Sequence, residues 1–193
     1  MSYSSISKIA AGILLVGTLA ACGSDDSDVA SIAAPAAPTT FTVAGTAATG
    51  AVFANATITI VGSDGTTYPA AGESAVVTGA DGSYTITLPL TAKPPFVVQA
   101  ARDDKTLVSV VAEAKDTTTN ITPITNLIAS RLSSSGDPAK LAQEINDNYK
   151  ANKPVLFDAT ALKAKVDEIV ALIKPLMDAV PGSTSDPLNG KLV

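Results

Sequence analysis

The side chains of this chain that could carry chemistry are few: one thiol, together with carboxylates, lysines and tyrosines. Histidine is absent from all 193 residues, and Cys22 is the one cysteine. A Ser-His-Asp triad, a Cys-His pair, an imidazole zinc site and a histidine proton shuttle all need the missing ring. These classes of active site are excluded, so an enzyme with this sequence would depend on carboxylate, lysine or tyrosine chemistry.

Three pairs of acidic residues are close enough in sequence for acid and base catalysis. They are Asp103 with Asp104, Glu113 with Asp116, and Asp167 with Glu168. The first pair falls in a predicted hairpin turn, the second at the end of a predicted strand and the third on the polar side of a predicted helix. Glycoside hydrolysis would need opposed carboxylates in a cleft. We interpret all three pairs as solvated surface and expect no enzyme, with a carboxylate-dependent hydrolase as the alternative.

Composition narrows the expected partners. The chain is 46% hydrophobic but 4% aromatic, and its net charge of -5 would repel a phosphate backbone. Few aromatic rings are available to stack on bases. We therefore expect no nucleic acid partner, and we predict neither a cofactor nor a metal.

Other polar groups have a structural and a functional interpretation. Asp64 and Asp81 lie in Gly-containing turns, and a calcium site there is the less favoured alternative. Ser133, Ser134 and Ser135 form a loop with no base in view that could activate a hydroxyl.

The surroundings of Cys22 indicate export. Residues 1–8 carry Lys8 and the terminal amine, and the uncharged run IAAGILLVGTL follows at 9–19. A positive start, a short apolar stretch and small residues are the layout of a secretory signal. The apolar run is shorter than the roughly 20 residues that a membrane-spanning helix needs. We therefore predict a signal peptide over residues 1–21.

The tetrapeptide Leu19-Ala20-Ala21-Cys22 resembles the lipobox of bacterial lipoproteins. The resemblance implies cleavage between Ala21 and Cys22, a diacylglyceryl group on the Cys22 sulfur and acylation of the new amine. Anchoring follows because each buried methylene contributes about 0.8 kcal/mol, so two or more acyl chains hold firmly. By resemblance to the enterobacterial sorting rule, an aspartate after the cysteine would favour the inner membrane. Gly23 stands at this position instead, which favours the outer membrane. Cleavage after an ordinary signal peptide, with Cys22 unmodified, is the alternative.

Residues 22–40 are polar and Ala-rich, with Pro35 and Pro38, and indicate a flexible tether. Short stretches rich in Val, Ile and Thr follow, separated by turns such as SDG, ADG and RDDK. They lie at 41–45, 56–61, 66–68, 74–78, 83–90, 96–102 and 106–114. Several alternate with a period of two, as expected for half-buried strands. Residues 41–120 therefore predict a small antiparallel β-sandwich of six or seven strands.

This region also resembles a known family. The order V-x-G at 43–45, then GAVFANATITIVGSDG, then TGADGSYTITLP is similar to the carboxypeptidase regulatory-like, or prealbumin-like (transthyretin-like), β-sandwich. That family is usually an accessory module without catalytic residues, so the resemblance implies a binding or structural role. Asp81-Gly82 has a physical explanation as a tight turn and Tyr84 as a half-buried ring on the next strand.

Helical periodicity begins after Asn120. Thr122 and Pro123 predict one helix start, and Asp137 and Pro138 predict another. Apolar stripes run through Leu141, Ile145 and Tyr149, and through Leu162, Val166, Ile169, Ile173 and Leu176. We expect Pro175 to kink or end the last helix. Residues 121–180 are thus a helical segment, and 181–193 a tail without a cap, either disordered or left from a longer unit.

Together these features predict an α+β fold, with a sandwich followed by two or three α-helices. The expected function is a non-catalytic, membrane-anchored lipoprotein that presents its sandwich in the bacterial cell envelope. Its expected partners are the lipid bilayer, through acylated Cys22, and an envelope protein or polymer. The alternative is a carboxylate-dependent envelope hydrolase.

Overall fold

The computed structural model describes residues 38–179 and 186–190, without the side chain of Leu176. The strands are β1 (Thr40–Thr46), β2 (Thr57–Val61), β3 (Thr67–Tyr68), β4 (Val76–Val77), β5 (Ser83–Pro89), β6 (Phe96–Arg102), β7 (Lys105–Val111) and β8 (Thr117–Thr118). The helices are α1 (Pro123–Leu132), the 3-10 turn η1 (Pro138–Lys140), α2 (Leu141–Lys150) and α3 (Ala159–Asp178). The predicted α+β fold is confirmed, with strands before helices in the chain.

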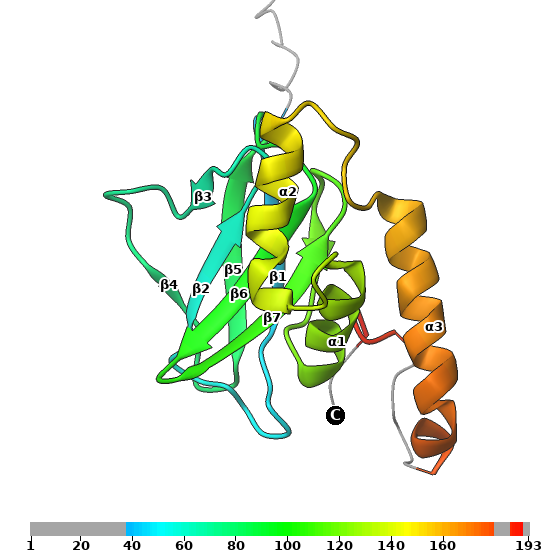
Figure 1. Cartoon of the computed structure of the whole chain (residues 1–193). Coiled ribbons are helices and arrows are strands. Elements are labelled where there is room, and N and C mark those ends of the chain that lie inside the picture. Colours follow the sequence, from blue (N-terminus) through cyan, green and yellow to red (C-terminus); the bar gives the residue numbers. More distant parts are fainter. Residues whose placement is uncertain (1–37, 180–185, 191–193) are drawn as a thin grey trace, which may run out of the picture. The chain divides into compact units, whose positions relative to one another are not determined.

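The strands form two sheets (Figure 1). One has the order β5-β1-β8, and the other has the order β3-β2-β6-β7 with β4 also pairing with β2. All pairings are antiparallel except that of β8, which runs parallel to β1. The described strands number eight rather than six or seven, because the two residues of β8 were not expected to pair.

The two sheets enclose the first hydrophobic core. Strand β5 alternates strictly, with Tyr84, Ile86 and Leu88 buried and the residues between them exposed. Phe41 and Phe96 meet across the sheets with ring centroids 5.7 Å apart. This is the pattern of a sandwich, in which one face of each sheet packs inward.

A second core lies on the other face of the β6-β7 sheet. Val97, Val108 and Val110 pack there against buried side chains of the helices, among them Ile128 and Ile145. Strand β6 therefore has apolar residues on both faces, and the helices cover the sheet as a third layer (Figure 1).

The start of α1 is fixed to the edge of β7 by hydrogen bonds. Thr122 caps the helix, with its hydroxyl accepting from Thr125 N, and Pro123 occupies the first turn as predicted. The Thr125 hydroxyl donates to Val108 O at 3.1 Å, and Val108 N donates to Asn126 Oδ1 at 3.0 Å. Helix side chains thus take the place of a neighbouring strand.

The later helices can be compared with the predicted pattern at Tyr149 and at Pro175. Leu141 and Ile145 are buried on α2, but Tyr149, one turn further on, is 50% exposed. Of the two outcomes expected at Pro175, a kink or the end of the helix, the second is excluded, because α3 continues to Asp178. One missing N–H removes one helical hydrogen bond, while Leu162 and Ile169 anchor the same helix in the second core.

Part of the predicted tail belongs to the packed structure. Leu188 is buried in the second core, and Asn120 N donates to Leu188 O at 2.6 Å. The Asn120 amide also donates from Nδ2 to Gly190 O at 2.6 Å and accepts at Oδ1 from Thr46 N at 3.2 Å. Asn120, which is 3% exposed, therefore joins strand β1 to residues 186–190.

Candidate functional site

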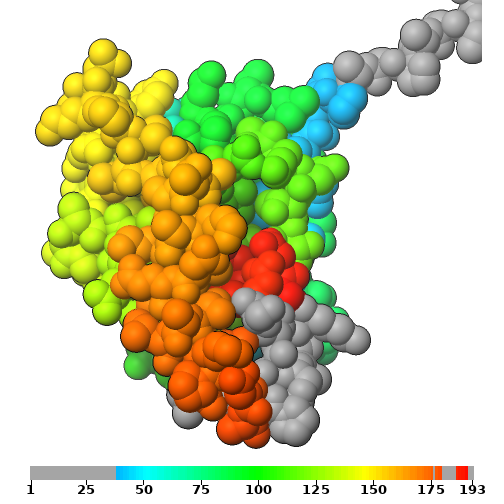
Figure 2. All heavy atoms as spheres, turned by 90° about the vertical axis from the view of Figure 1, so that its right-hand side faces the viewer, coloured from blue at the N-terminus to red at the C-terminus, as the bar shows by residue number. Residues whose placement is uncertain are grey.

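A cleft lies at the edge of the sandwich, within the described residues. It has a volume of about 430 Å³ and is bounded by the end of β7, by β8, by α3 and by residues 186–190. We call it the edge cleft. Figure 2 shows this side of the molecule, with residues 186–190 in red beside α3 in orange.

Apolar side chains line the inner part of the edge cleft and charged side chains line its rim. Val110 and Leu188 are buried there, and Val166 is half-buried. On the strand side, Lys115 Nζ lies 2.5 Å from Glu113 Oε2. On the helix side, Lys163 Nζ lies 2.7 Å from Asp167 Oδ2. The cleft therefore offers an apolar interior between two ion pairs.

Residues 186–190 close one side of the cleft through a turn of their own. Asp186 Oδ1 accepts from Leu188 N at 3.1 Å and from Asn189 N at 2.9 Å. Gly190 N donates to Asp186 O at 2.8 Å. No site was expected in this segment, although its Asp-Pro and Asn-Gly pairs are turn signals that mark it in the sequence.

The fold places the first predicted carboxylate pair in a turn and directs the members of the other two pairs to different partners. Asp103 lies in the β6-β7 hairpin turn with a φ of 55°, which agrees with the predicted turn at this position. Asp116 is directed to strand β1, where its Oδ1 accepts from Thr42 N at 2.7 Å, while Glu113 pairs with Lys115. Glu113 and Asp116 therefore bind different partners and do not form a catalytic dyad.

The third pair is also divided between two lysines of its own helix. Asp167 binds Lys163, and Glu168 Oε2 lies 2.9 Å from Lys165 Nζ. The hydrogen bond and charge of Lys165 lower the pKa of Glu168. A lowered pKa makes a carboxylate a weaker base, which is unfavourable for acid and base catalysis near neutral pH.

One carboxylate from each of two different pairs lines the same cleft. Glu113 approaches from the strand side and Asp167 from the helix side. Sequence spacing did not bring these two together, because they are 54 positions apart. Each is paired with a lysine of its own segment, so the cleft can recognise polar groups at its rim and apolar groups in its interior.

The serine loop does have an acidic group beside it, contrary to our expectation. Glu144 on α2 accepts from both the hydroxyl and the N–H of Ser135, from Ser134 N and from the Ser133 hydroxyl, at 2.6–3.1 Å. Partial burial would raise the pKa of Glu144, but these hydrogen bonds together lower it to about 2. A group with that pKa does not take a proton from serine, so the arrangement holds the loop in place.

The buried tyrosine is not available for chemistry either. Tyr84 is 4% exposed and donates from its hydroxyl to Thr119 O at 2.5 Å. Burial raises the pKa of this hydroxyl well above its usual range. The ring packs beside Gly45, where an added Cβ would lie 2.0 Å from Thr119 O. Tyr84 therefore links the two edges of strand β1 as a structural residue.

The two turn aspartates considered for calcium each cap their own turn. Asp64 Oδ1 accepts from Thr66 N at 3.0 Å. Asp81 Oδ1 accepts from the Ser83 hydroxyl at 2.6 Å and from Ser83 N, and these bonds lower its pKa. Within residues 38–179 and 186–190, no three acidic or cysteine residues gather as a metal site would require.

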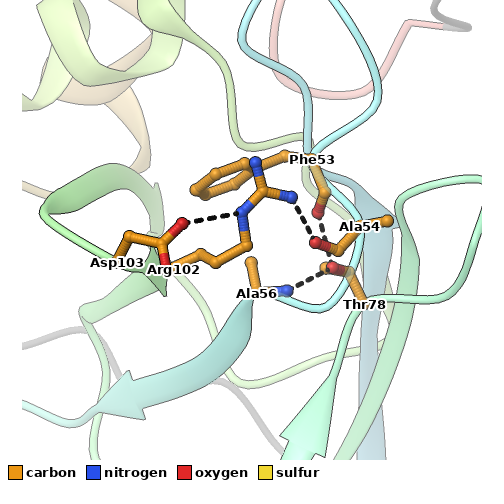
Figure 3. A network of polar contacts seen from close by, with 6 residues as sticks. All are labelled: Phe53, Ala54, Ala56, Thr78, Arg102 and Asp103. Atoms are coloured by element: carbon orange, nitrogen blue, oxygen red, sulfur yellow. Dashed lines mark hydrogen bonds and ion pairs between the residues drawn. The ribbon is translucent and has the colours of Figure 1, made fainter.

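A polar network orders the loop that precedes β2 (Figure 3). The Arg102 guanidinium lies over the Phe53 ring, 4.6 Å from its centroid, and donates from Nη1 to Ala54 O at 2.6 Å. The buried Thr78 hydroxyl donates to Phe53 O at 2.5 Å and accepts from Ala56 N at 2.9 Å. These contacts hold the loop end of the sandwich rigid.

Cys22 and the predicted cleavage site at Ala21 and Cys22 lie outside the described residues, as do residues 1–21 and most of the tether. In the part of the chain that the structure describes, none of the helices combines the length and apolarity required to cross a bilayer. No protein-family model matches the sequence, and no curated protein matches it significantly.

Proposed function

We propose that this protein is a non-catalytic bacterial lipoprotein, held on the outer membrane by acylated Cys22, whose sandwich acts as a binding or structural module. The observation that carries the non-catalytic part is that two carboxylates of the cleft are paired with lysines, while the third, Asp186, caps its own turn. Glu113 and Asp167 each lie within 2.7 Å of a lysine ammonium of the same segment. Acid and base catalysis by these two groups would need both carboxylates to be available to the substrate, whereas each is engaged in an ion pair with a lysine of its own segment.

The anchoring part rests on the sequence Leu19-Ala20-Ala21-Cys22 and on where the folded domain begins. Strand β1 starts at Thr40, where the predicted tether ends. An anchor at Cys22 would therefore be separated from the domain by a short tether. A flexible chain of this length spans roughly 20–25 Å, which is sufficient to lift the domain from the headgroups.

The edge cleft is the surface on which this module would bind. An apolar interior with a few polar groups at the rim is typical of small ligand sites. The resemblance to the carboxypeptidase regulatory-like sandwich supports an accessory role. We propose an envelope protein or polymer as the partner that enters or covers the cleft.

Metabolic labelling with a fatty-acid analogue tests the anchor. The wild-type chain should be labelled and membrane-bound, and Cys22→Ala should be neither. Gly23→Asp should keep the label but move the protein to the inner membrane in an enterobacterial host, and Gly23→Ser is its matched control. Label or membrane attachment that persists in Cys22→Ala would refute the lipoprotein proposal.

A carboxylate-dependent envelope hydrolase is the second candidate, because Glu113 and Asp167 line one cleft. Its test is hydrolysis of isolated envelope polymers by the full chain. Activity that is lost in both Glu113→Gln and Asp167→Asn, while Asp103→Asn retains it, would favour the hydrolase over the binding module.

A further inference from the structure

The edges of the two sheets differ in which groups satisfy their backbone N–H and C=O groups. Helix α1 covers the edge of β7, where Thr125 and Asn126 bond both backbone groups of Val108. The free side of β2 is paired with β3 and β4. On the β8 side of β1, Asp116 and Asn120 bond the backbone N–H groups of Thr42 and Thr46. Strand β5 has β1 as its partner strand on one side and, among the described strands, none on the other.

The direction of each backbone group of β5 follows from the groups of β1. In β1, Thr42 N, Ala44 O and Thr46 O bond groups on the β8 side. Because backbone groups alternate along a strand, Phe41, Val43 and Gly45 bond toward β5, where their register partners are Leu88, Ile86 and Tyr84. The N–H and C=O groups of Thr85 and Thr87 therefore point away from β1.

At both ends of this open edge the outward-facing backbone groups are already hydrogen-bonded within the chain. At one end, Ser83 O accepts from Gly79 N at 2.8 Å and Ser83 N donates to Asp81 Oδ1 at 3.0 Å. At the other end, Pro89 has no N–H, and its carbonyl accepts from Ala92 N at 2.9 Å. The open segment is thus Thr85–Ile86–Thr87, with the backbone groups of both threonines unpaired in the described part of the chain.

We propose that this segment pairs with the same segment of a second copy of the chain, antiparallel and about a two-fold axis at Ile86. In that register Thr85 faces Thr87 of the second copy, and their N–H and C=O groups bond one another. The pairing ends at Ser83 and Pro89, because Gly79 and Asp81 already bond the outward groups of Ser83 and Ala92 already bonds the carbonyl of Pro89. No backbone group of the edge is left without a partner.

The side chains of the strand favour a second copy over a charged partner. Residues 83–89 contain no charged group, whereas the chain as a whole has a net charge of -5. The net charge makes two copies repel one another, and an edge without charged groups adds no local repulsion to a contact between them. Threonine pairs across antiparallel strands are favourable, and Thr85 and Thr87 are exposed.

A charge-exchange experiment on the full chain tests both the contact and its register. One variant carries Thr85→Lys and Thr87→Lys, and the other carries Thr85→Glu and Thr87→Glu. Like charges then face one another in each variant alone, whereas opposite charges face one another in the mixture. Sedimentation in a density-matched detergent measures association, and Thr57→Lys, an exposed threonine of strand β2, serves as the matched control.

The wild-type chain and the Thr57→Lys control should be dimeric. Each charged variant alone should lose association by at least about tenfold, and mixing the two should restore it. A third variant, Thr85→Pro, removes an N–H that faces the open edge and should be monomeric with an unchanged thermal melt. A monomeric wild-type chain, or charged variants that associate as the wild type does, would overturn the proposal.

Discussion

Replacement of Glu144 by glutamine should show that a carboxylate charge holds the loop of Ser133–Ser135. The pKa of Glu144 is about 2 in the folded protein against 4.5 as the reference value. At about 1.4 kcal/mol per unit this difference corresponds to about 3 kcal/mol. Because the side chain is partly exposed, we reduce the figure to about 1–2 kcal/mol. Glutamine keeps the shape but loses the charge that strengthens these hydrogen bonds.

The sign of the pH dependence follows from the lowered pKa. The stabilisation is present in full above the reference pKa of 4.5 and is lost as the pH falls toward the folded value of about 2. Urea unfolding followed by circular dichroism should therefore give Glu144→Gln a free energy of unfolding about 1–2 kcal/mol below the wild type at pH 7. Near pH 2.5 the difference should fall to about a quarter of that value.

The matched control for this measurement is Asp147→Asn, an exposed carboxylate on the same helix. It should leave the free energy of unfolding within about 0.5 kcal/mol of the wild type at pH 7. A difference between wild type and Glu144→Gln that stays the same at both pH values would refute the electrostatic explanation and leave only packing.

Two further substitutions test the polar joints of the sandwich. Gly45→Ala places a Cβ 2.0 Å from Thr119 O and should prevent folding or lower the melting temperature severely. The control Gly50→Ala has open space around the new Cβ but a φ of 90°, and it should lower the free energy of unfolding by about 1 kcal/mol. Equal melting temperatures of the two variants would contradict the close approach at Gly45. Thr78→Val removes the hydroxyl that bonds Phe53 O and Ala56 N, and it should lower the free energy of unfolding by about 1–3 kcal/mol. Thr78→Ser keeps the hydroxyl and should retain most of the wild-type stability. Equal stability of the two variants in urea would contradict the hydrogen-bonding role of Thr78.

The sandwich was predictable because its strands carry their burial pattern in the sequence. Alternation at Tyr84, Ile86 and Leu88 and the turn residues before it are local signals, and the structure places β5 accordingly. Strand β8 was not predictable in this way. Its two threonines form a strand through parallel pairing with β1, a contact that no local pattern encodes.

The candidate site was less predictable because its parts come from distant segments. Glu113 and Asp167 were each recognised as acidic residues, but their shared cleft depends on how α3 packs beside β8. The contact of Glu144 with the serine loop and the docking of Leu188 on Asn120 are likewise tertiary. The helix start at Thr122 and Pro123, in contrast, is a local signal and was predicted correctly.

The central position of β1 determines how the domain would carry a mechanical load. Any pull on the chain before Thr40 acts along β1, which is held by β5 on one side and by β8 on the other. The hydrogen bonds of β1 to β5 run across the strand, from alternate residues of the seven register pairs between Thr40 and Thr46. A force along the strand loads these bonds together in shear rather than opening them one at a time. The domain should therefore resist extension from its N-terminal side more than it would if an edge strand received the pull.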